Sequence, residues 1–460
     1  NFQPIFLTSI TTAIGFLSMN FSDSPPFQDL GNLVAMGVMI AFVFAVTIFP
    51  ALLRMLPIRT KLNKPKDNDA MTSLASFVIT RRKLLLPLTS VIIFSSMLFI
   101  PSNELNDNFV EYFDTTVPYR IGTDFMQENL SGMTLLEISV ESGESNGVNK
   151  VAYLRTLSDF SDWLRQQYQT DHVNTITDTL KRLNKNMHGD DTDWYKLPSD
   201  NEMAAQYLLL YEMSLPYGLD LNNQLNVDKS SAKIVGTFKN LTSTELIALE
   251  EGINTWFKDN ASQYNVVIAS PSLMFAHIGQ RSINSMLIGT TAALLLISLM
   301  LGVALRSWKF GLISLLPNLI PAGVAFGVWG LVDGQIGLSL SVVVGMTLGI
   351  VVDDTVHFLS KYLHARREDK KSPQAAVTYA FGNVGSALWI TTLVLVAGFA
   401  VLAQSTFSLN ADMGLLTAIT ILIALIVDFL FLPPLLIAIE GVGEKAQEND
   451  ELTHTLSVDK

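Results

Sequence analysis

Residues 338–362 read LSLSVVVGMTLGIVVDDTVHFLSKY, and they decide how the rest of the chain is interpreted. The ionisable side chains Asp353, Asp354 and His357 stand well inside this hydrophobic run. About 20 apolar residues in a helix are long enough to cross the hydrocarbon of a bilayer. Ionisable groups there are energetically unfavourable and mark functional positions. The segment therefore predicts a transmembrane helix that carries a polar site.

Seven further hydrophobic segments predict a membrane protein with several spans. Of the 460 residues, 49% are hydrophobic and 16% are charged, which is typical of such a chain. The predicted spans are residues 2–20, 32–56, 84–101, 283–304, 310–331, 338–360, 385–404 and 413–438. We therefore expect an all-α membrane bundle of about eight transmembrane helices.

Basic residues orient these spans. Lys and Arg gather in the loops after the second and sixth spans, whereas the loops near 23–29, 333–335 and 404–412 carry none. Loops enriched in Lys and Arg face the cytoplasm. The basic residues of the two loops are Arg54, Arg59, Lys61, Lys64, Lys66, Arg81, Arg82, Lys83, Lys361, Arg366, Arg367, Lys370 and Lys371. Residues 102–282 then lie outside.

The external segment is acidic. Residues 104–277 hold about 25 Asp and Glu against about 12 Lys and Arg, and so carry nearly all of the net charge of -12. This charge argues against nucleic acid as a partner. The chain has no cysteine, which excludes disulfides. It starts at Asn1 directly in a hydrophobic span, so we expect the C-terminal part of a longer protein.

Two hairpins repeat each other at an offset of 383 residues. The aligned pairs are Thr8 and Thr391, Gly15 and Gly398, Phe16 and Phe399, Asp29 and Asp412, Gly31 and Gly414, and Pro50 and Pro433. The alternative is chance similarity between two apolar hairpins, but glycine, aspartate and proline match as well. Parallel repeats are common in transporters.

The repeat predicts the domain organisation. Residues 1–57 are the last two transmembrane helices of a first repeat, and a second repeat follows after a cytoplasmic linker. The remaining predicted parts are the linker 58–83, the helix 84–101, the external domain 102–282, the five-helix domain 283–440 and a disordered cytoplasmic tail 441–460.

The external domain is predicted to contain two βαβ units. Residues 134–142 alternate like a strand, 148–169 have helical periodicity, and 172–178 again resemble a strand. A second strand, helix and strand follow over 231–239, 242–259 and 264–269, where Thr242 or Ser243 can cap the helix and Glu245 stands in its first turn. Such a pair of units favours an α+β, ferredoxin-like fold. The intervening 180–230 is expected to be a mobile insertion with one short helix near 201–213.

The acid pair is predicted to form one cluster with His357. At 100° per residue, His357 projects between Asp353 and Asp354 on one helical face. Adjacent carboxylates in a low-dielectric environment are expected to share a proton and to titrate as a unit, so the pair can carry protons. The alternative is a static polar network that fixes helix packing. His357 is either a member of the relay or a hydrogen-bonding partner of the aspartates.

Further polar residues stand inside neighbouring spans. Asp428, whose repeat mate is Ala45, either faces the acid cluster or reaches water and basic groups at the membrane interface. Thr391 and Thr392 can supply hydroxyls to a relay or bond back to their own helix. Asp29 and Asp412 stand at span entrances and are interpreted as helix N-caps.

Two spans carry residues that shape helix packing. Pro317 and Pro321 remove backbone donors and predict a kink whose freed carbonyls Asn318 helps to satisfy. Ser341, Gly345 and Gly349 precede Asp353 at steps of four, a stripe of small residues that allows a neighbouring helix to approach closely.

The chain resembles the resistance-nodulation-division (RND) superfamily, in its mycobacterial-large-type (MMPL) and Patched-like exporter branch. The motifs that carry the resemblance are LRSWKFGLISLLPNLIPAGVAFGVWG at 305–330, GMTLGIVVDDTVHFLSKY at 345–362 and DFLFLPPLL at 428–436. The resemblance implies a proton-motive-force-driven exporter in the bacterial inner membrane, with a periplasmic porter domain and a lipid or other hydrophobic cargo. The family's coupling role falls on Asp353 and Asp354, although several members have Asp-Tyr here.

Two other functions remain open. One is a Patched-like, sterol-sensing receptor or lipid-binding protein without turnover, and the other is a SecDF-like aid to protein translocation. A second copy of the chain or a periplasmic accessory protein are further expected partners. No Walker sequence, nucleophile elbow or metal-ligand spacing is present, so we expect neither an enzyme nor a cofactor or metal site.

Overall fold

The computed structural model describes residues 2–55, 69–216, 219–239 and 241–440. Residues 58–68 of the predicted linker 58–83, with Arg59, Lys61, Lys64 and Lys66, and the predicted tail 441–460 lie outside these residues. The chain divides into two compact units. Residues 1–104 and 280–460 form the membrane unit, and residues 105–279 form the α+β unit.

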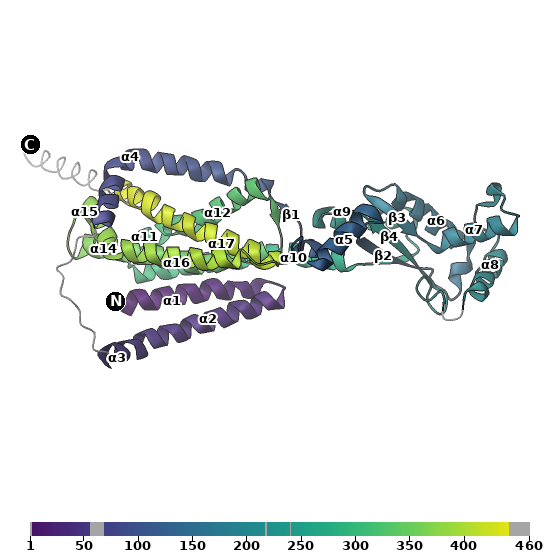
Figure 1. Ribbon diagram of the computed structural model, residues 1–460, viewed down its shortest axis with the longest axis horizontal. Helices are drawn as coiled ribbons and strands as arrows, with labels where there is room; N and C mark the ends of the chain where they lie inside the picture. Colours follow the sequence, from purple (N-terminus) through teal and green to yellow (C-terminus); the bar gives the residue numbers. More distant parts are fainter. Residues whose placement is uncertain (1, 56–68, 217–218, 240, 441–460) are drawn as a thin grey trace, which may run out of the picture. The chain divides into compact units, whose positions relative to one another are not determined.

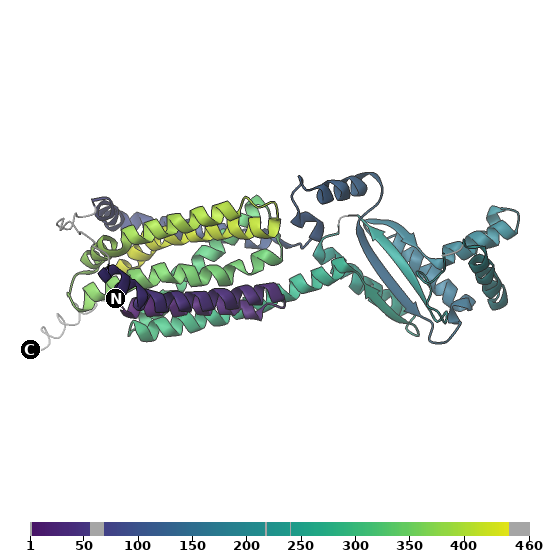
Figure 2. The same ribbon diagram turned by 60° about the horizontal axis from the view of Figure 1, so that its bottom comes forward.

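The membrane unit is a bundle of helices. In the described part of the chain, eight helical segments are long and apolar enough to cross a membrane, as the sequence predicts. Figures 1 and 2 show the α1–α2 hairpin running alongside the other helices of the bundle. The helices are α1 (Phe2–Leu17), α2 (Pro25–Val46), α3 (Ile48–Met55), α4 (Asp69–Met97), α10 (Pro271–Ala304), α11 (Trp308–Ile313), α12 (Leu315–Val332), α13 (Leu338–Ser341), α14 (Val343–Arg367), α15 (Pro373–Ala380), α16 (Ser386–Leu402) and α17 (Ser408–Ile426), with π turns η6 (Phe381–Gly385) and η7 (Val427–Phe431).

Two helices begin well before the predicted spans. Helix α4 starts at Asp69 rather than at 84, so that Arg81, Arg82 and Lys83 are helical. Helix α10 starts at Pro271 rather than at 283. Helical hydrogen bonds continue through polar residues, whereas hydropathy marks only the apolar part of a helix.

The predicted caps at Asp29 and Asp412 are wrong. Helix α2 is preceded by Ser24 and begins with Pro25, and α17 is preceded by Phe407. Both aspartates therefore lie inside their helices, about one turn from the start. Proline at the first helical position begins α2 earlier than hydropathy suggests.

Helix α14 packs against α1 through glycine. A Cβ atom on Gly15 would lie 2.7 Å from the Cα atom of Gly349, and one on Gly345 would lie 2.8 Å from the Ser18 Oγ. The Thr12 hydroxyl donates a hydrogen bond to the Gly349 carbonyl at 2.9 Å. Only residues without a side chain allow two helix backbones to come this close.

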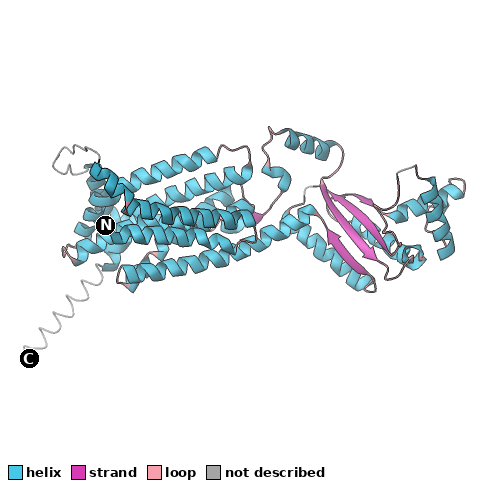
Figure 3. Ribbon diagram, turned by 90° about the horizontal axis from the view of Figure 1, so that it is seen from below, coloured by secondary structure: helices cyan, strands magenta, loops and turns pink. Residues whose placement is uncertain are grey.

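The α+β unit contains a four-stranded sheet in the order β3-β4-β2-β5. All three strand pairs are antiparallel. This is the order of two interleaved βαβ units, and the unit is therefore ferredoxin-like. Figure 3 shows the sheet with helices beside it. Its elements are β2 (Thr134–Glu141), α6 (Val151–Arg165), β3 (Thr170–Asn174), β4 (Ser231–Phe238), α9 (Ser243–Asn260) and β5 (Asn265–Ala269).

The first helix of the sheet unit is tied to two strands by a buried hydroxyl. Tyr153 Oη donates to the Val140 carbonyl at 2.6 Å and accepts from the Ala232 amide at 3.1 Å. Burial raises the pKa of this tyrosine above its ordinary value. Of the two predicted caps of α9, Thr242 is the N-cap, and it forms a capping box with Glu245.

Three predictions for the α+β unit need correction. The strand predicted at 172–178 ends at Asn174, because Thr175 caps a new helix, α7 (Ile176–Met187). The segment 180–230 therefore holds the end of α7 as well as the predicted helix, which is α8 (Asn201–Ser214). Helix α5 (Pro118–Asn129) was not predicted.

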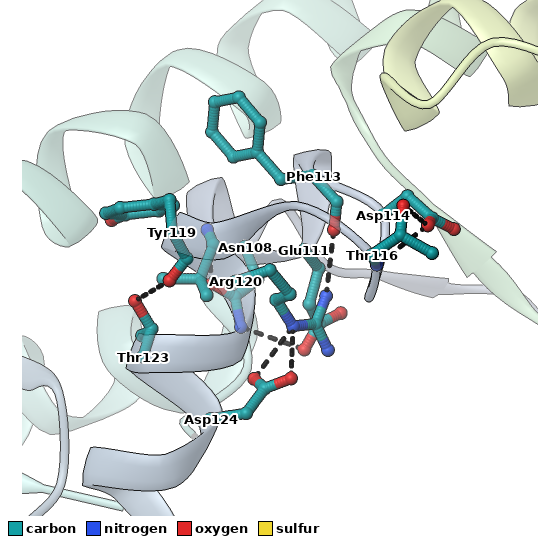
Figure 4. A network of polar contacts seen from close by, with 10 residues as sticks. Asn108, Glu111, Phe113, Asp114, Thr116, Tyr119, Arg120, Thr123 and Asp124 are labelled. Atoms are coloured by element: carbon teal, nitrogen blue, oxygen red, sulfur yellow. Dashed lines mark hydrogen bonds and ion pairs between the residues drawn. The ribbon is translucent and has the colours of Figure 1, made fainter.

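A local polar network shapes the segment before the sheet (Figure 4). The Arg120 Nε lies 2.7 Å from the Asp124 Oδ1, one helical turn further along α5. Asp114 accepts hydrogen bonds from the hydroxyl and the amide of Thr116, which hold the pKa of that carboxyl below its ordinary value. These contacts order the chain between α4 and the first strand of the sheet.

The minor elements complete the order along the chain. They are the short strands β1 (Glu104–Leu105) and β6 (Gln335–Ile336) and the 3₁₀ turns η1 (Ser18–Phe21), η2 (Ile100–Ser102), η3 (Phe109–Tyr112), η4 (Gly147–Asn149) and η5 (Thr192–Trp194).

The glycine contact between α1 and α14 gives a stability test with an internal control. We expect Gly15→Ala to lower the unfolding free energy by about 1–3 kcal/mol, because its methyl group would overlap the backbone of Gly349. A Cβ atom on Gly398, the repeat mate of Gly15, would meet no atom of the described residues within 4 Å. Gly398→Ala should be neutral or stabilising, since alanine is the better helix former. Equal thermal stability of the two purified variants would contradict this packing.

Candidate functional site

Helix α14 presents the predicted acid pair on consecutive residues. The His357 Nε2 lies 3.3 Å from the Asp353 Oδ1, one helical turn away, at ion-pair distance. The two side chains are 32% and 45% exposed, so they lie at the edge of the buried face of α14. Asp353 and His357 thus form a pair of their own beside Asp354.

Asp354 points to a neighbouring helix. Its Oδ2 accepts a hydrogen bond of 3.4 Å from the Thr392 hydroxyl on α16. Thr392 is buried, whereas Thr391 is exposed and bonds back to the carbonyls of Ala387 and Leu388. The structure therefore brings Thr392 to the cluster and leaves Thr391 outside it.

Asp428 joins the site from the last span. It lies in the π turn η7 and is fully buried, and its Oδ1 accepts a hydrogen bond of 3.0 Å from Thr355. Thr355 follows Asp354 directly in the chain, so this bond links α14 to η7. The structure therefore places Asp428 at the acid cluster and not at the membrane interface. Single π turns inside α-helices are frequent at functional sites.

Thr355 is a site residue that the sequence did not reveal. It is fully buried and donates to Asp428. Threonine inside a membrane helix most often bonds to its own backbone, so its type gives no signal. In the sequence, only its position next to Asp354 indicates that Thr355 could belong to the site.

The three carboxylates form a connected electrostatic group. When ionised, Asp354 is repelled by ionised Asp353 and Asp428 and attracted by a protonated His357. The Thr392 hydroxyl stabilises the charged form of Asp354, and the Thr355 hydroxyl stabilises the charged form of Asp428. Such a group can take up and release protons, because the charge of each member changes the cost of ionising the next.

The proline-containing helix lies beside this group. Helix α12 follows the short α11 after a break at Ser314 and has Pro321 inside it. Pro317, Asn318 and Pro321 are all buried. Asn318 does not satisfy a freed carbonyl as expected, because neither its Nδ2 nor its Oδ1 has a hydrogen-bond partner within the described residues.

The described residues combine eight helices that are long and apolar enough to cross a membrane with a ferredoxin-like α+β unit, and the chain is a multi-pass membrane protein. The chain belongs to the MMPL family, whose model matches residues 3–81 and 229–454.

The chain is also similar to three other proteins. The membrane protein MJ1562 of Methanocaldococcus jannaschii is 28% identical over 148 residues, which are 32% of this chain and 38% of that protein. In structure, the chain is similar to the hedgehog release protein Disp of the water bear Hypsibius dujardini, with a TM-score of 0.64, 16% identity, and coverage of 95% of this chain and 58% of Disp. A weaker likeness to SecDF has a TM-score of 0.48 and 14% identity over 97% of this chain and 49% of SecDF.

The hydrogen bond between Thr355 and Asp428 gives a test of the site geometry. Thr355→Val keeps the shape of the side chain but leaves Asp428 without its donor. We expect a loss of about 1–3 kcal/mol in unfolding free energy, because a buried group loses its partner. Thr391→Val, outside the cluster, should change stability by less than about 0.5 kcal/mol. Thermal unfolding of the purified variants measures both, and an unaltered Thr355→Val protein would contradict the contact.

Proposed function

We propose that the full protein is a proton-motive-force-driven exporter of a hydrophobic or lipid-like substrate. The observation that carries this proposal is the buried carboxylate group of α14 and η7. Asp354 and Asp428 interact with each other and accept hydrogen bonds from Thr392 and Thr355, so their charge state is coupled to three segments of the bundle.

Protonation can drive movement because it changes the forces between these helices. An ionised Asp354 repels an ionised Asp428 and attracts a protonated His357, whereas a neutral Asp354 does neither. The relative positions of α14 and η7 that have the lowest free energy therefore differ between the two charge states. One charge that crosses a membrane potential of 100 mV releases about 2.3 kcal/mol, enough to shift such an equilibrium.

The hydrophobic cargo is supported by a cleft in the α+β unit. The cleft has a volume of about 710 Å³, in the range of small-molecule sites. Most of its lining is apolar, and at its edge the His277 Nε2 lies 2.7 Å from the Glu250 Oε2. The lining residues are Leu135, Glu137, Glu250, Ile268, Ala269, Ser270, Pro271, Leu273, Met274 and His277. An apolar chain with a polar head group fits this composition.

The proposal includes a location. We place the protein in the bacterial inner membrane with residues 102–282 in the periplasm, because the basic loops assign the opposite side to the cytoplasm. Protons, the membrane and a lipid or other hydrophobic molecule are the proposed partners. A second copy of the chain or a periplasmic accessory protein is a further proposed partner. The chain spans only 38% and 58% of the length of the two relatives quoted above, so these partners are proposed for the whole protein.

Substitution of the acid pair tests proton coupling. In the full-length protein reconstituted in vesicles, we expect Asp353→Asn and Asp354→Asn to reduce proton-driven transport at least tenfold, because asparagine cannot carry the proton. Asp29→Asn is the control, since Asp29 is an exposed acid on α2. Transport that is independent of the pH gradient in the wild type, or unchanged in both variants, would contradict the proposal and favour a receptor without turnover.

The cleft is tested by a polar substitution at an exposed wall. Met274 lines the cleft and is 51% exposed, so Met274→Asp should leave the fold intact. We expect about tenfold weaker binding of an apolar fluorophore or a fluorescent fatty acid, because the loss of apolar contact is worth about 1.5–3 kcal/mol. Met213→Asp changes an exposed methionine on α8, away from the cleft lining. Equal affinities of the two variants, measured by fluorescence titration, would exclude the cleft as the binding site.

A further inference from the structure

Several buried polar side chains of the membrane unit have hydrogen-bonding atoms without a partner among the described residues, and three of these lie on α12, α17 and η7. They are Asn318 on α12, with both amide atoms, Thr417 on α17, with its hydroxyl, and Asp428 on η7, with its Oδ2. Asn318 is 3% exposed, and Thr417 and Asp428 are fully buried. An unpaired buried group of this kind costs about 1–3 kcal/mol.

These three residues come from helical segments that pack together. Ala325 and Trp329 of α12 pack in one cluster with Val343 of α14 and Leu416 of α17. Asn318 precedes Ala325 by two turns and Trp329 by three, and therefore lies on that same face of α12. Thr417 and Asp428 are separated by three turns and share a face of α17, about 16 Å apart along its axis.

The contacts also fix the level of Asn318 along the bundle. Ile320 and Val324 of α12 pack with Val427 and Phe431 of η7, whereas Ala325 and Trp329 pack with Leu416. The two helices are therefore antiparallel, and Asn318 lies near the level of Asp428. Thr417 lies further toward the start of α17, which the basic loops assign to the external side.

More oxygen atoms line the same interface. Thr347 and Thr420 are buried, and each donates its hydroxyl proton to its own helix, to the carbonyls of Val343 and Leu416 at 2.7 Å. The hydroxyl oxygens keep lone pairs that can accept a further hydrogen bond. Hydrogen-bonding groups thus recur between the external end of α17 and Asp428.

We propose that Asn318 is a water-binding residue in a proton access route that runs along the α12–α17 interface from the external side, past Thr417, to Asp428. Water offers two donors and two acceptors, and can satisfy an amide and a carboxylate together. The amide binds and orients water without gaining or losing a proton itself. The route rests on the proposed proton coupling and assigns the path by which protons arrive.

A leucine at position 318 separates this role from packing. Leucine has nearly the shape of asparagine but no polar atoms. Replacement of an unpaired buried polar group by an apolar one of similar shape is neutral or stabilising. In the full-length protein we therefore expect Asn318→Leu to unfold at the wild-type temperature or higher, and to take up protons from the external side at least tenfold more slowly. Asn318→Ser, which restores a hydroxyl, should recover part of the rate.

The control is a buried hydroxyl elsewhere in the bundle. Ser298 on α10 also has no hydrogen-bond partner within the described residues and is 8% exposed. Ser298→Ala should leave proton uptake unchanged. A pH-sensitive dye inside vesicles measures the uptake after an external pH jump. Normal uptake by Asn318→Leu, or a slow rate in Asn318→Ser equal to that of Asn318→Leu, would overturn the access route.

The failure of this inference is distinguishable from that of the proposed function. Loss of uptake in Asp354→Asn together with normal uptake in Asn318→Leu overturns the access route alone. Normal uptake in Asp354→Asn overturns proton coupling itself, and the route with it.

Discussion

A carboxylate inside a bilayer is stable only when neighbouring helices supply hydrogen-bond donors and opposite charge, and this constraint organises the membrane unit. Asp354 uses a hydroxyl from α16, Asp428 uses one from α14, and Asp353 uses an imidazole from its own helix. The first two contacts tie α14 to α16 and to η7. The site is therefore also a structural junction, and a change in its charge must change the packing around it.

The two faces of α14 make different kinds of contact with the neighbouring helices. One side carries Gly345 and Gly349, where α1 approaches to backbone distance. The other side carries Asp354 and Thr355, which bond to α16 and η7. A close glycine contact holds a helix by dispersion forces and is insensitive to charge, whereas the acid contacts depend on protonation. The helix can thus keep its contact with α1 while its contacts with α16 and η7 respond to protons.

Sequence patterns predicted the architecture where the signal is local. Hydropathy over about 20 residues found all eight spans, and strand alternation with the Thr242 and Glu245 cap found the ferredoxin-like strands and the helix α9. Hydropathy did not reveal the early start of α4. The first turns of this helix contain polar residues such as Arg81, which are helical but lower the hydropathy. The cap at Thr175 was missed, and with it the helix α7, because its threonine belongs to a run that also alternates like a strand.

The site was predictable only in part, because local sequence patterns identify charged residues but not the contacts between helices. Charge inside an apolar run identifies Asp353, Asp354 and Asp428 in the sequence alone. Which hydroxyl reaches which carboxylate depends on the rotation of each helix about its axis, so Thr392 and Thr391 could not be separated and Thr355 was not found. Asn318 was expected to bond within its own helix, but its environment is set by α14 and α17, whose contacts no local pattern encodes.

If the proposed function is right, the carboxylates of α14 and η7 exchange protons with water. Infrared difference spectroscopy of the full-length protein in lipid, recorded between acidic and alkaline buffer, detects this exchange. We expect a carbonyl band of protonated carboxyl groups that titrates with pH, shifts in heavy water, and is altered in both Asp354→Asn and Asp428→Asn. A spectrum in which the carboxyl bands of the wild type and of these two variants are identical would contradict it.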